Sequence, residues 1–263
     1  TLNEINKDLC SSKKMFRLLQ GDVGSGKTIV SLLAAFNTVI SGFQVAVMAP
    51  TEILARQHYN LARKIFPKNL NIQLISGKSD YKTKKDILNK LSTNEIDIIF
   101  GTHAIFQKKV NYKNLGLIII DEQHKFGVNQ RKRLSDKGGN NCDILLMTAT
   151  PIPRTLTMTM YGDMDLSIIA EKPKLRKPIK TYSKLESKID DIITFIKKEI
   201  KVGNQIFWVC PLIEESKKLD HASAVNKFKY LQKIFPNQVS LLHGKTETED
   251  KENILNSFLK NEF

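Results

Sequence analysis

Short apolar runs alternate with longer amphipathic stretches over residues 1–170. Six apolar runs predict buried strands: Phe16–Gln20, Gln44–Ala49, Ile72–Ile75, Ile96–Phe100, Leu117–Ile120 and Ile144–Met147. Between them, three stretches have a helical period: Lys27–Val39, Glu52–Phe66 and Lys82–Leu91. Buried runs separated by helices are typical of a parallel sheet with helices on both faces. The pattern therefore predicts an α/β fold.

The pattern breaks between Glu171 and Lys180, where the chain is charged, contains two prolines and shows no periodicity. This composition predicts a linker. The α/β rhythm then resumes with these predicted elements: a helical face from Ile189 to Ile200, a strand at Ile206–Val209, a helix at Ala224–Ile234 and a strand at Val239–Leu242. We expect one domain at residues 1–170, a linker at 171–180 and a partial second domain at 181–263.

The charge balance bears on the kind of partner. Lys and Arg total 41 against 27 Asp and Glu, which gives a net charge of +14. Such a surplus favours a polyanionic partner such as nucleic acid, because each neutralised phosphate releases condensed counterions. A lysine-rich composition spread over solvated faces would give the same number. Charge alone leaves both interpretations open.

Cysteine usage and hydropathy limit the remaining classes. Cys10, Cys142 and Cys210 lie far apart and form no Cys-x-x-Cys pair, which argues against a disulfide framework or a zinc site. No apolar run approaches the roughly 18 to 20 residues that span a bilayer. The chain does not open with a basic-then-apolar signal segment. We expect a cytoplasmic protein without a membrane partner.

A phosphate-binding loop follows the first predicted strand. The residues Gly21, Asp22, Val23, Gly24, Ser25, Gly26, Lys27 and Thr28 fit the pattern Gly-x4-Gly-Lys-[Ser/Thr]. Glycines let the backbone N–H groups face a phosphate, and the next helix adds its positive N-terminal end. Lys27 can reach the β- and γ-phosphates, and the Thr28 hydroxyl can bind Mg²⁺. A strand before and a helix after the motif strengthen the prediction of ATP binding.

A pair of carboxylates ends the strand Leu117–Ile120. Asp121 and Glu122 would lie at the carboxyl edge of a parallel sheet, where such sheets bind ligands. Asp121 would hold the Mg²⁺ shell through water, and Glu122 would orient or deprotonate the attacking water. An acidic pair after a strand is by itself more often a solvated strand end. Together with the upstream phosphate loop, the pair predicts ATP hydrolysis.

These motifs resemble those of superfamily 2 helicases, and within them the bacterial RecG family of DNA helicases. The resemblance covers the whole chain and includes the phosphate loop, the Asp-Glu-Gln-His box at residues 121–124 with Lys-Phe-Gly-Val-Asn-Gln-Arg after it, and Thr-Ala-Thr-Pro-Ile-Pro-Arg-Thr at residues 148–155. It implies a P-loop NTPase of RecA-like fold followed by a partial second RecA-like domain. The implied activity is ATP-driven remodelling of branched or forked DNA by a monomeric motor.

Further site residues are implied only by this resemblance. Lys27, Asp121 and Glu122 take the catalytic roles already described, and Gln123 and His124 would sense the γ-phosphate. Thr148 and Thr150 would couple hydrolysis to strand movement. Residues that would follow the nucleic-acid backbone are Pro50, Thr51, Arg56, Gly101 and Thr102. Small hydroxyls and backbone N–H groups suit such a track because they contact sugar-phosphate without reading bases.

Ordinary structural roles compete with these assignments. Thr148 and Thr150 could be turn formers, His124 a satisfied core histidine, and Arg56 a solvated helix charge. Function also has alternatives: a transcription-repair coupling factor-like translocase, a nucleotide-dependent binding module without unwinding, or a P-loop ATPase unrelated to nucleic acid. Gln123 and Ser25 favour RecG, since the coupling factors usually have Glu and Phe there.

Several family features have no counterpart in the sequence. We find no glutamine motif upstream of the phosphate loop, no N-terminal wedge domain, and neither the glycine-rich nor the arginine-bearing motif of the second motor domain. An arginine finger contributes about 10³ to 10⁵ to turnover. We therefore expect these 263 residues alone to bind nucleotide weakly and to hydrolyse it poorly even with forked DNA.

Overall fold

The computed structural model describes residues 1–77, 80–107, 109–122, 142–150, 164–171, 178–211 and 224–262. The chain divides into two compact units, Thr1–Pro178 and Ile179–Phe263, which we call unit 1 and unit 2. The division falls inside the linker predicted at residues 171–180.

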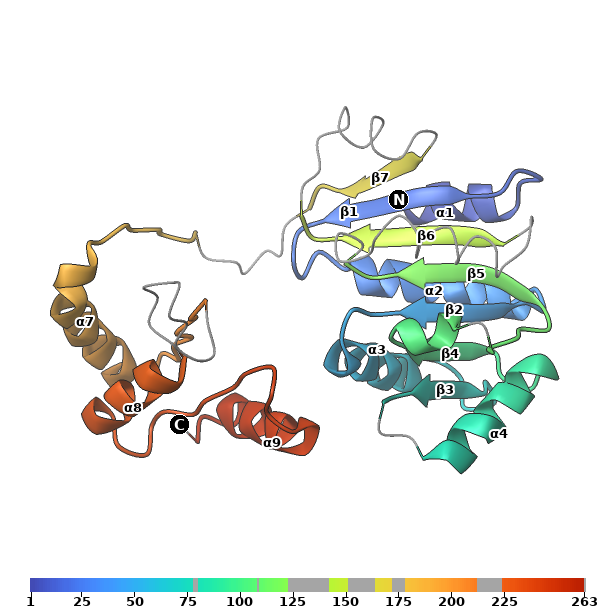
Figure 1. The fold of residues 1–263 in the computed structure, drawn as a ribbon. Helices are drawn as coiled ribbons and strands as arrows, with labels where there is room; N and C mark the ends of the chain where they lie inside the picture. Colours follow the sequence, from blue (N-terminus) through green and yellow to red (C-terminus); the bar gives the residue numbers. More distant parts are fainter. Residues whose placement is uncertain are drawn as a thin grey trace, which may run out of the picture. The chain divides into compact units, whose positions relative to one another are not determined.

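Unit 1 is built on a parallel sheet. Its described strands are β1 (Phe16–Gly21), β2 (Gln44–Met48), β3 (Ile72–Ile75), β4 (Ile98–Gly101), β5 (Leu115–Ile120), β6 (Asp143–Thr148) and β7 (Asp165–Ile169). They lie in the order β3-β4-β2-β5-β6-β1-β7, and every neighbouring pair is parallel (Figure 1). All carboxyl ends therefore meet at one edge of the sheet.

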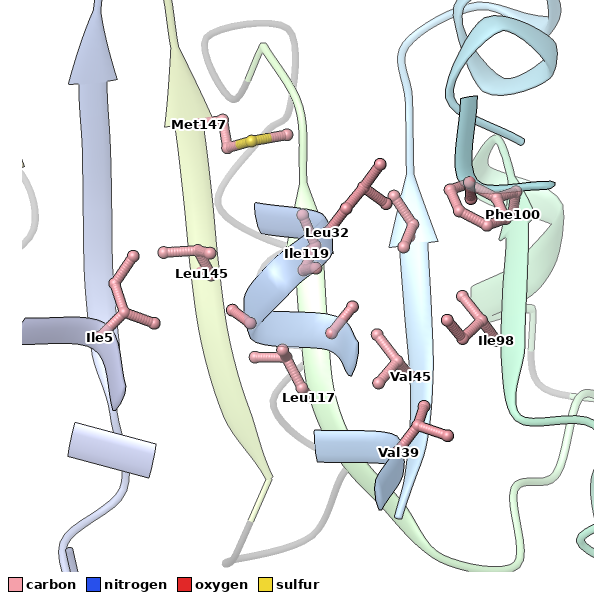
Figure 2. Packing of buried hydrophobic residues seen from close by; sticks show 14 of the residues in the cluster. Ile5, Leu32, Val39, Val45, Ile98, Phe100, Leu117, Ile119, Leu145 and Met147 are labelled. Carbon is pink, nitrogen blue, oxygen red and sulfur yellow. The ribbon is translucent and has the colours of Figure 1, made fainter. Parts of the chain in front are cut away.

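Helices cover both faces of this sheet. They are α1 (Leu2–Leu9), α2 (Lys27–Ile40), α3 (Glu52–Ile65), α4 (Tyr81–Ser92) and the 3₁₀ helix η1 (His103–Phe106). Leu18 and Ile118 belong to an apolar cluster that includes Leu91 of α4. Their neighbours Leu19 and Ile119 belong to a second cluster with α1, α2 and α3 (Figure 2). Successive strand residues thus enter opposite clusters, as a sheet buried on both faces requires. The predicted α/β fold is confirmed.

Besides the 3₁₀ helix η1, two elements of unit 1 were not predicted, α1 and β7, and one side chain contacts both of them. Arg17 on β1 is 8% exposed, and its guanidinium donates to Asp8 Oδ2 of α1 at 2.7 Å and to Ser167 Oγ of β7 at 2.9 Å. Both segments are short, eight residues for α1 and five for β7, so each carries little sequence signal of its own. This contact adds to the backbone pairing of β7 with β1 and to the burial of Ile5 of α1, all of them tertiary contacts that no local pattern contains.

Unit 2 contains helices α7 (Ile189–Lys201), α8 (Ala224–Ile234) and α9 (Thr248–Leu259) and the 3₁₀ helix η4 (Glu186–Lys188) among its described residues. The predicted helices at Ile189–Ile200 and Ala224–Ile234 are confirmed. An apolar cluster joins Ile193 and Ile196 of α7 to Leu231 of α8. In the described part of the chain, no helix is both long enough and apolar enough to cross a membrane.

The strands predicted at Ile206–Val209 and Val239–Leu242 are wrong for this structure, because neither segment pairs with another strand in the described part of unit 2. The alternation that suggested the first strand is nevertheless present. Ile206 and Trp208 pack against the helix cluster, while Phe207 and Val209 are 76% and 87% exposed. The segment has the side-chain pattern of a strand, but a strand also needs a backbone partner.

A buried glutamine ties together the amino ends of β2, β4 and β5. Gln44 is 2% exposed, and its Nε2 donates to the carbonyls of Leu91 at 3.0 Å and Ile96 at 2.9 Å. Its Oε1 accepts from the backbone N–H groups of Lys113 at 2.9 Å and Asn114 at 3.1 Å. One buried side chain thus bonds four backbone groups, of which the Leu91 carbonyl and the Lys113 N–H also bond each other at 3.3 Å.

We expect Gln44→Leu to lower the free energy of unfolding by about 1 to 3 kcal/mol, because four backbone groups each lose a hydrogen bond to this buried side chain. Urea unfolding followed by circular dichroism measures the change. Gln57→Leu, at an exposed position of α3, is the matched control and should stay within about 0.5 kcal/mol. Equal stability of the two variants would contradict the role assigned to Gln44.

Candidate functional site

The predicted nucleotide residues meet at the carboxyl edge of the sheet. Register pairs place Gln20 beside Thr148 and Ile120 beside Leu146, so the loop after β1, the turn after β6 and Asp121 after β5 leave the same edge. With β6 between them, β1 and β5 are about 10 Å apart, from a spacing of roughly 4.8 Å per strand. This distance is short enough for one triphosphate to contact both.

The loop from Gly21 to Thr28 curls before it enters α2. Gly24 and Gly26 have φ angles of 79° and 96°, a region that residues with a side chain rarely adopt. Gly26 is the N-cap of α2, no side chain caps this helix start, and its first turn carries no acidic residue. The N–H groups of the first turn of α2 and its positive end are thus presented without an acidic side chain from that turn, as an anion site requires.

The Lys27 ammonium lies back across the same loop. Its Nζ donates to the Gly21 carbonyl at 2.7 Å and to the Asp22 carbonyl at 2.9 Å. The Asp22 Oδ1 in turn accepts from the Val23 N–H at 2.8 Å. The Lys27 ammonium is therefore held against the phosphate loop. Val23, within the same loop, is 66% exposed.

Ser25 and Gly21 form the tightest part of the loop. The Ser25 Oγ is buried and has no hydrogen-bond partner among the described residues. A methyl group added at Gly21 would lie 2.5 Å from that oxygen and 3.1 Å from the Cβ of Ile169 on β7. Gly21 therefore permits the loop's close approach, and the orphaned hydroxyl is a donor that a phosphate oxygen would satisfy. The residues present fit a bound phosphate.

Asp121 is buried, and both its carboxylate oxygens have partners. Its Oδ2 lies 2.8 Å from His58 Nε2, and its Oδ1 accepts from the Glu122 N–H at 3.0 Å. Its own N–H donates to the Met48 carbonyl at 2.9 Å, which continues the pairing with β2. These contacts hold the carboxylate in one orientation.

Glu122 has an unusual backbone conformation directly after Asp121. Its φ of 50° is in the left-handed region, where residues other than glycine are uncommon. Strained backbone of this kind clusters at functional sites. Its side chain is partly buried at the same edge as the phosphate loop.

Thr148 and Thr150 form a turn at the end of β6. The Thr148 Oγ1 is the acceptor for the Thr150 N–H at 3.1 Å, with Thr148 buried and Thr150 exposed. The turn-forming role considered for these residues is thus present. Their coupling role stays a prediction, and Gln123 and His124 lie outside the described residues.

The residues predicted to contact nucleic acid lie along the same edge on the neighbouring strands. Pro50 and Thr51 follow β2. Gly101 is the last residue of β4 and Thr102 follows it, and the Ala49 N–H donates to the Gly101 carbonyl at 2.9 Å. Thr51 is exposed and caps α3 by accepting from the Leu54 N–H at 3.3 Å. Arg56 is partly buried on α3. The edge therefore has a nucleotide half on β5, β6 and β1 and a second half on β2 and β4. Nucleic-acid contact by the second half stays a prediction.

His58 is the site residue that sequence reasoning missed. Together with Ala55 and Ala62 it forms the buried face of α3. The spacing of three and four residues places all three side chains on one helical face, where a histidine between two alanines is out of place. That mismatch was the available signal, because a buried imidazole needs a partner.

Few side chains here can hold a metal ion directly. The described residues contain no group of three or more His, Cys, Asp or Glu side chains that could do so. The candidate donors are the Thr28 hydroxyl and the Asp121 carboxylate, both hard oxygen ligands. Mg²⁺ suits such a small set, because it usually keeps several waters and takes its remaining ligands from one or two carboxylates and the phosphates.

The family of this chain follows from a comparison with protein-family models, because residues 3–159 match the DEAD/DEAH box helicase model. The chain belongs to the DEAD/DEAH box helicase family. This membership confirms that the α/β sheet of unit 1 is the RecA-like fold of these helicases.

Individual relatives of this DEAD/DEAH box chain are RecG helicases. It is 46% identical to the ATP-dependent DNA helicase RecG of Bacillus subtilis over 99% of its length, and 47% identical to that of Streptococcus pneumoniae over 98%. It covers 38% of each relative. A solved structure of RecG bound to a three-way DNA junction matches with a TM-score of 0.74 and 38% identity over 98% of this chain and 34% of that one. The resemblance to RecG is confirmed.

We expect Gly21→Ala to lower the free energy of unfolding by about 1 to 3 kcal/mol, because the added methyl group overpacks the loop. Ser25→Ala removes the nearest clashing atom, so the double variant should recover part of that loss. A double-mutant cycle from urea unfolding measures the coupling, with Ser25→Ala alone as the control. Purely additive effects would contradict the contact between these positions.

Proposed function

We propose that this chain is the ATP-hydrolysing motor part of a RecG-like DNA helicase, which couples hydrolysis to the remodelling of branched DNA. The main support is the single sheet edge that brings the Lys27 loop, Asp121, Glu122 and Thr148 together in a chain of the DEAD/DEAH box family. The chain spans 38% of the RecG relatives from B. subtilis and S. pneumoniae, so the activity proposed is that of a larger parent protein.

Each residue at the nucleotide half has a task in this proposal. The loop N–H groups and the Ser25 hydroxyl bind phosphate oxygens, and Lys27 moves from its carbonyl partners to the β- and γ-phosphates. Thr28 and Asp121 would hold Mg²⁺, Asp121 through water, and the ion when bound neutralises phosphate charge. Glu122 orients the attacking water and accepts its proton.

DNA is the proposed partner. The solved RecG relative is bound to a three-way DNA junction, and the net charge of +14 suits a polyanion. Pro50, Thr51, Arg56, Gly101 and Thr102 would form the DNA track on the β2 and β4 half of the edge. Residues 181–263 would belong to a second RecA-like domain, and the parent would act as a cytoplasmic monomer.

Replacing Lys27 by alanine should abolish nucleotide binding by this chain, because the only lysine ammonium of the loop is lost. Equilibrium titration with a fluorescent ADP derivative measures the affinity, and the melting temperature reports the fold. Lys64→Ala, at an exposed position of α3, is the matched control. Unchanged affinity in Lys27→Ala would contradict the proposed nucleotide site.

Glu122→Gln in the full-length parent should leave ATP binding intact and slow DNA-stimulated hydrolysis by about 10² to 10⁴, because only the proton acceptor is removed. Steady-state turnover with forked DNA and a nucleotide titration separate the two effects. Unchanged turnover would exclude Glu122 as the base. A parent without any DNA-stimulated hydrolysis would instead favour a nucleotide-dependent binding module.

A further inference from the structure

His58 and Asp121 form a buried pair that joins helix α3 to the end of β5. The two side chains are 10% and 12% exposed, and His58 Nε2 lies 2.8 Å from Asp121 Oδ2. A carboxylate oxygen can only accept, so the proton of this hydrogen bond is on Nε2. The pair therefore fixes which ring nitrogen of His58 faces the nucleotide site.

The backbone around both residues is itself well held. The Thr51 side chain caps the start of α3, and the helix buries the face formed by Ala55, His58 and Ala62. Asp121 is attached to β2 through the Met48 carbonyl. The small alanines on either side of His58 leave the imidazole as the one long side chain of that buried face. His58 can thus reach the carboxylate from a fixed helix.

We infer that His58 is a positioning residue for the metal site: by donating from Nε2 it holds the Asp121 carboxylate in the orientation that receives the waters of Mg²⁺. This inference rests on the proposed function, which places the ion at Asp121. Partners that orient a ligating carboxylate contribute about 10- to 100-fold to metal affinity. His58 supplies that orientation for Oδ2, while the Glu122 N–H supplies it for Oδ1.

The same contact spans the two halves of the sheet edge. His58 comes seven residues after Thr51, and seven residues of helix rise about 10 Å. α3 thus begins at the proposed DNA track and reaches the proposed metal site two turns later. A shift of α3 on DNA binding would move the donor that holds Asp121, so the pair connects the two halves physically.

Three substitutions separate positioning from simple packing. His58→Gln places an amide nitrogen at about the reach of Nε2, whereas His58→Asn places one at the reach of the nearer ring nitrogen and falls short of Asp121. His58→Leu fills space without donating. Asn60→Leu, at an exposed position of α3, is the control. Melting temperatures show that each variant folds.

The measurement is binding of a fluorescent ADP derivative as a function of MgCl₂ concentration, with the Mg²⁺-free affinity of each variant as its own reference. We expect His58→Leu and His58→Asn to raise the half-saturating MgCl₂ concentration about tenfold or more and His58→Gln to stay close to the unsubstituted chain. The Mg²⁺-free affinity should change little in all three.

Equal MgCl₂ requirements in His58→Leu and the unsubstituted chain would overturn the inference. Equal losses in His58→Gln and His58→Leu would do the same, since they would assign His58 a packing role. Either of these two outcomes would leave the proposed function intact. Nucleotide binding that is independent of MgCl₂ in the unsubstituted chain would overturn the inference together with the proposed metal role.

Discussion

Parallel pairing of β5, β6 and β1 is the constraint on which the candidate site depends. Because the three strands run in one direction, Asp121, Thr148 and the loop after Gly21 leave the sheet at one edge. Reversing any one of them would send its residues to the far edge. The pairing is held by burial on both faces, since Leu18 and Leu19 enter opposite apolar clusters.

Local chemistry made much of unit 1 predictable from the sequence. The boundaries of β1 to β6 lie within two residues of the predicted ones, because apolar runs bounded by turn residues carry their own signal. The phosphate loop was equally accessible, since its glycines, Lys27 and Thr28 are consecutive. Placing Asp121 and Glu122 beside this loop required one further rule, which is that parallel strands have their carboxyl ends at the same edge of the sheet.

What escaped prediction depends on contacts between distant residues. α1 and β7 are positioned by Arg17, whose partners are 9 and 150 residues away in the chain. His58 meets Asp121 across 63 residues. In unit 2, Ile206 to Val209 has the alternation of a strand, yet pairing requires a neighbour that no local pattern can supply. Periodicity reports which face a side chain takes, and not which backbone lies beside it.

The pairing of β7 with β1 has a mechanical consequence. The last register pair of this ladder joins Ile169 to Gly21, the first residue of the phosphate loop, and the chain runs on from β7 to unit 2. A force transmitted from unit 2 along the chain would therefore act as shear on the hydrogen bonds between β7 and β1. It would reach these bonds beside the phosphate loop. A force on the linker between the units and the binding of a phosphate would thus both act on the backbone at Gly21 and Ile169.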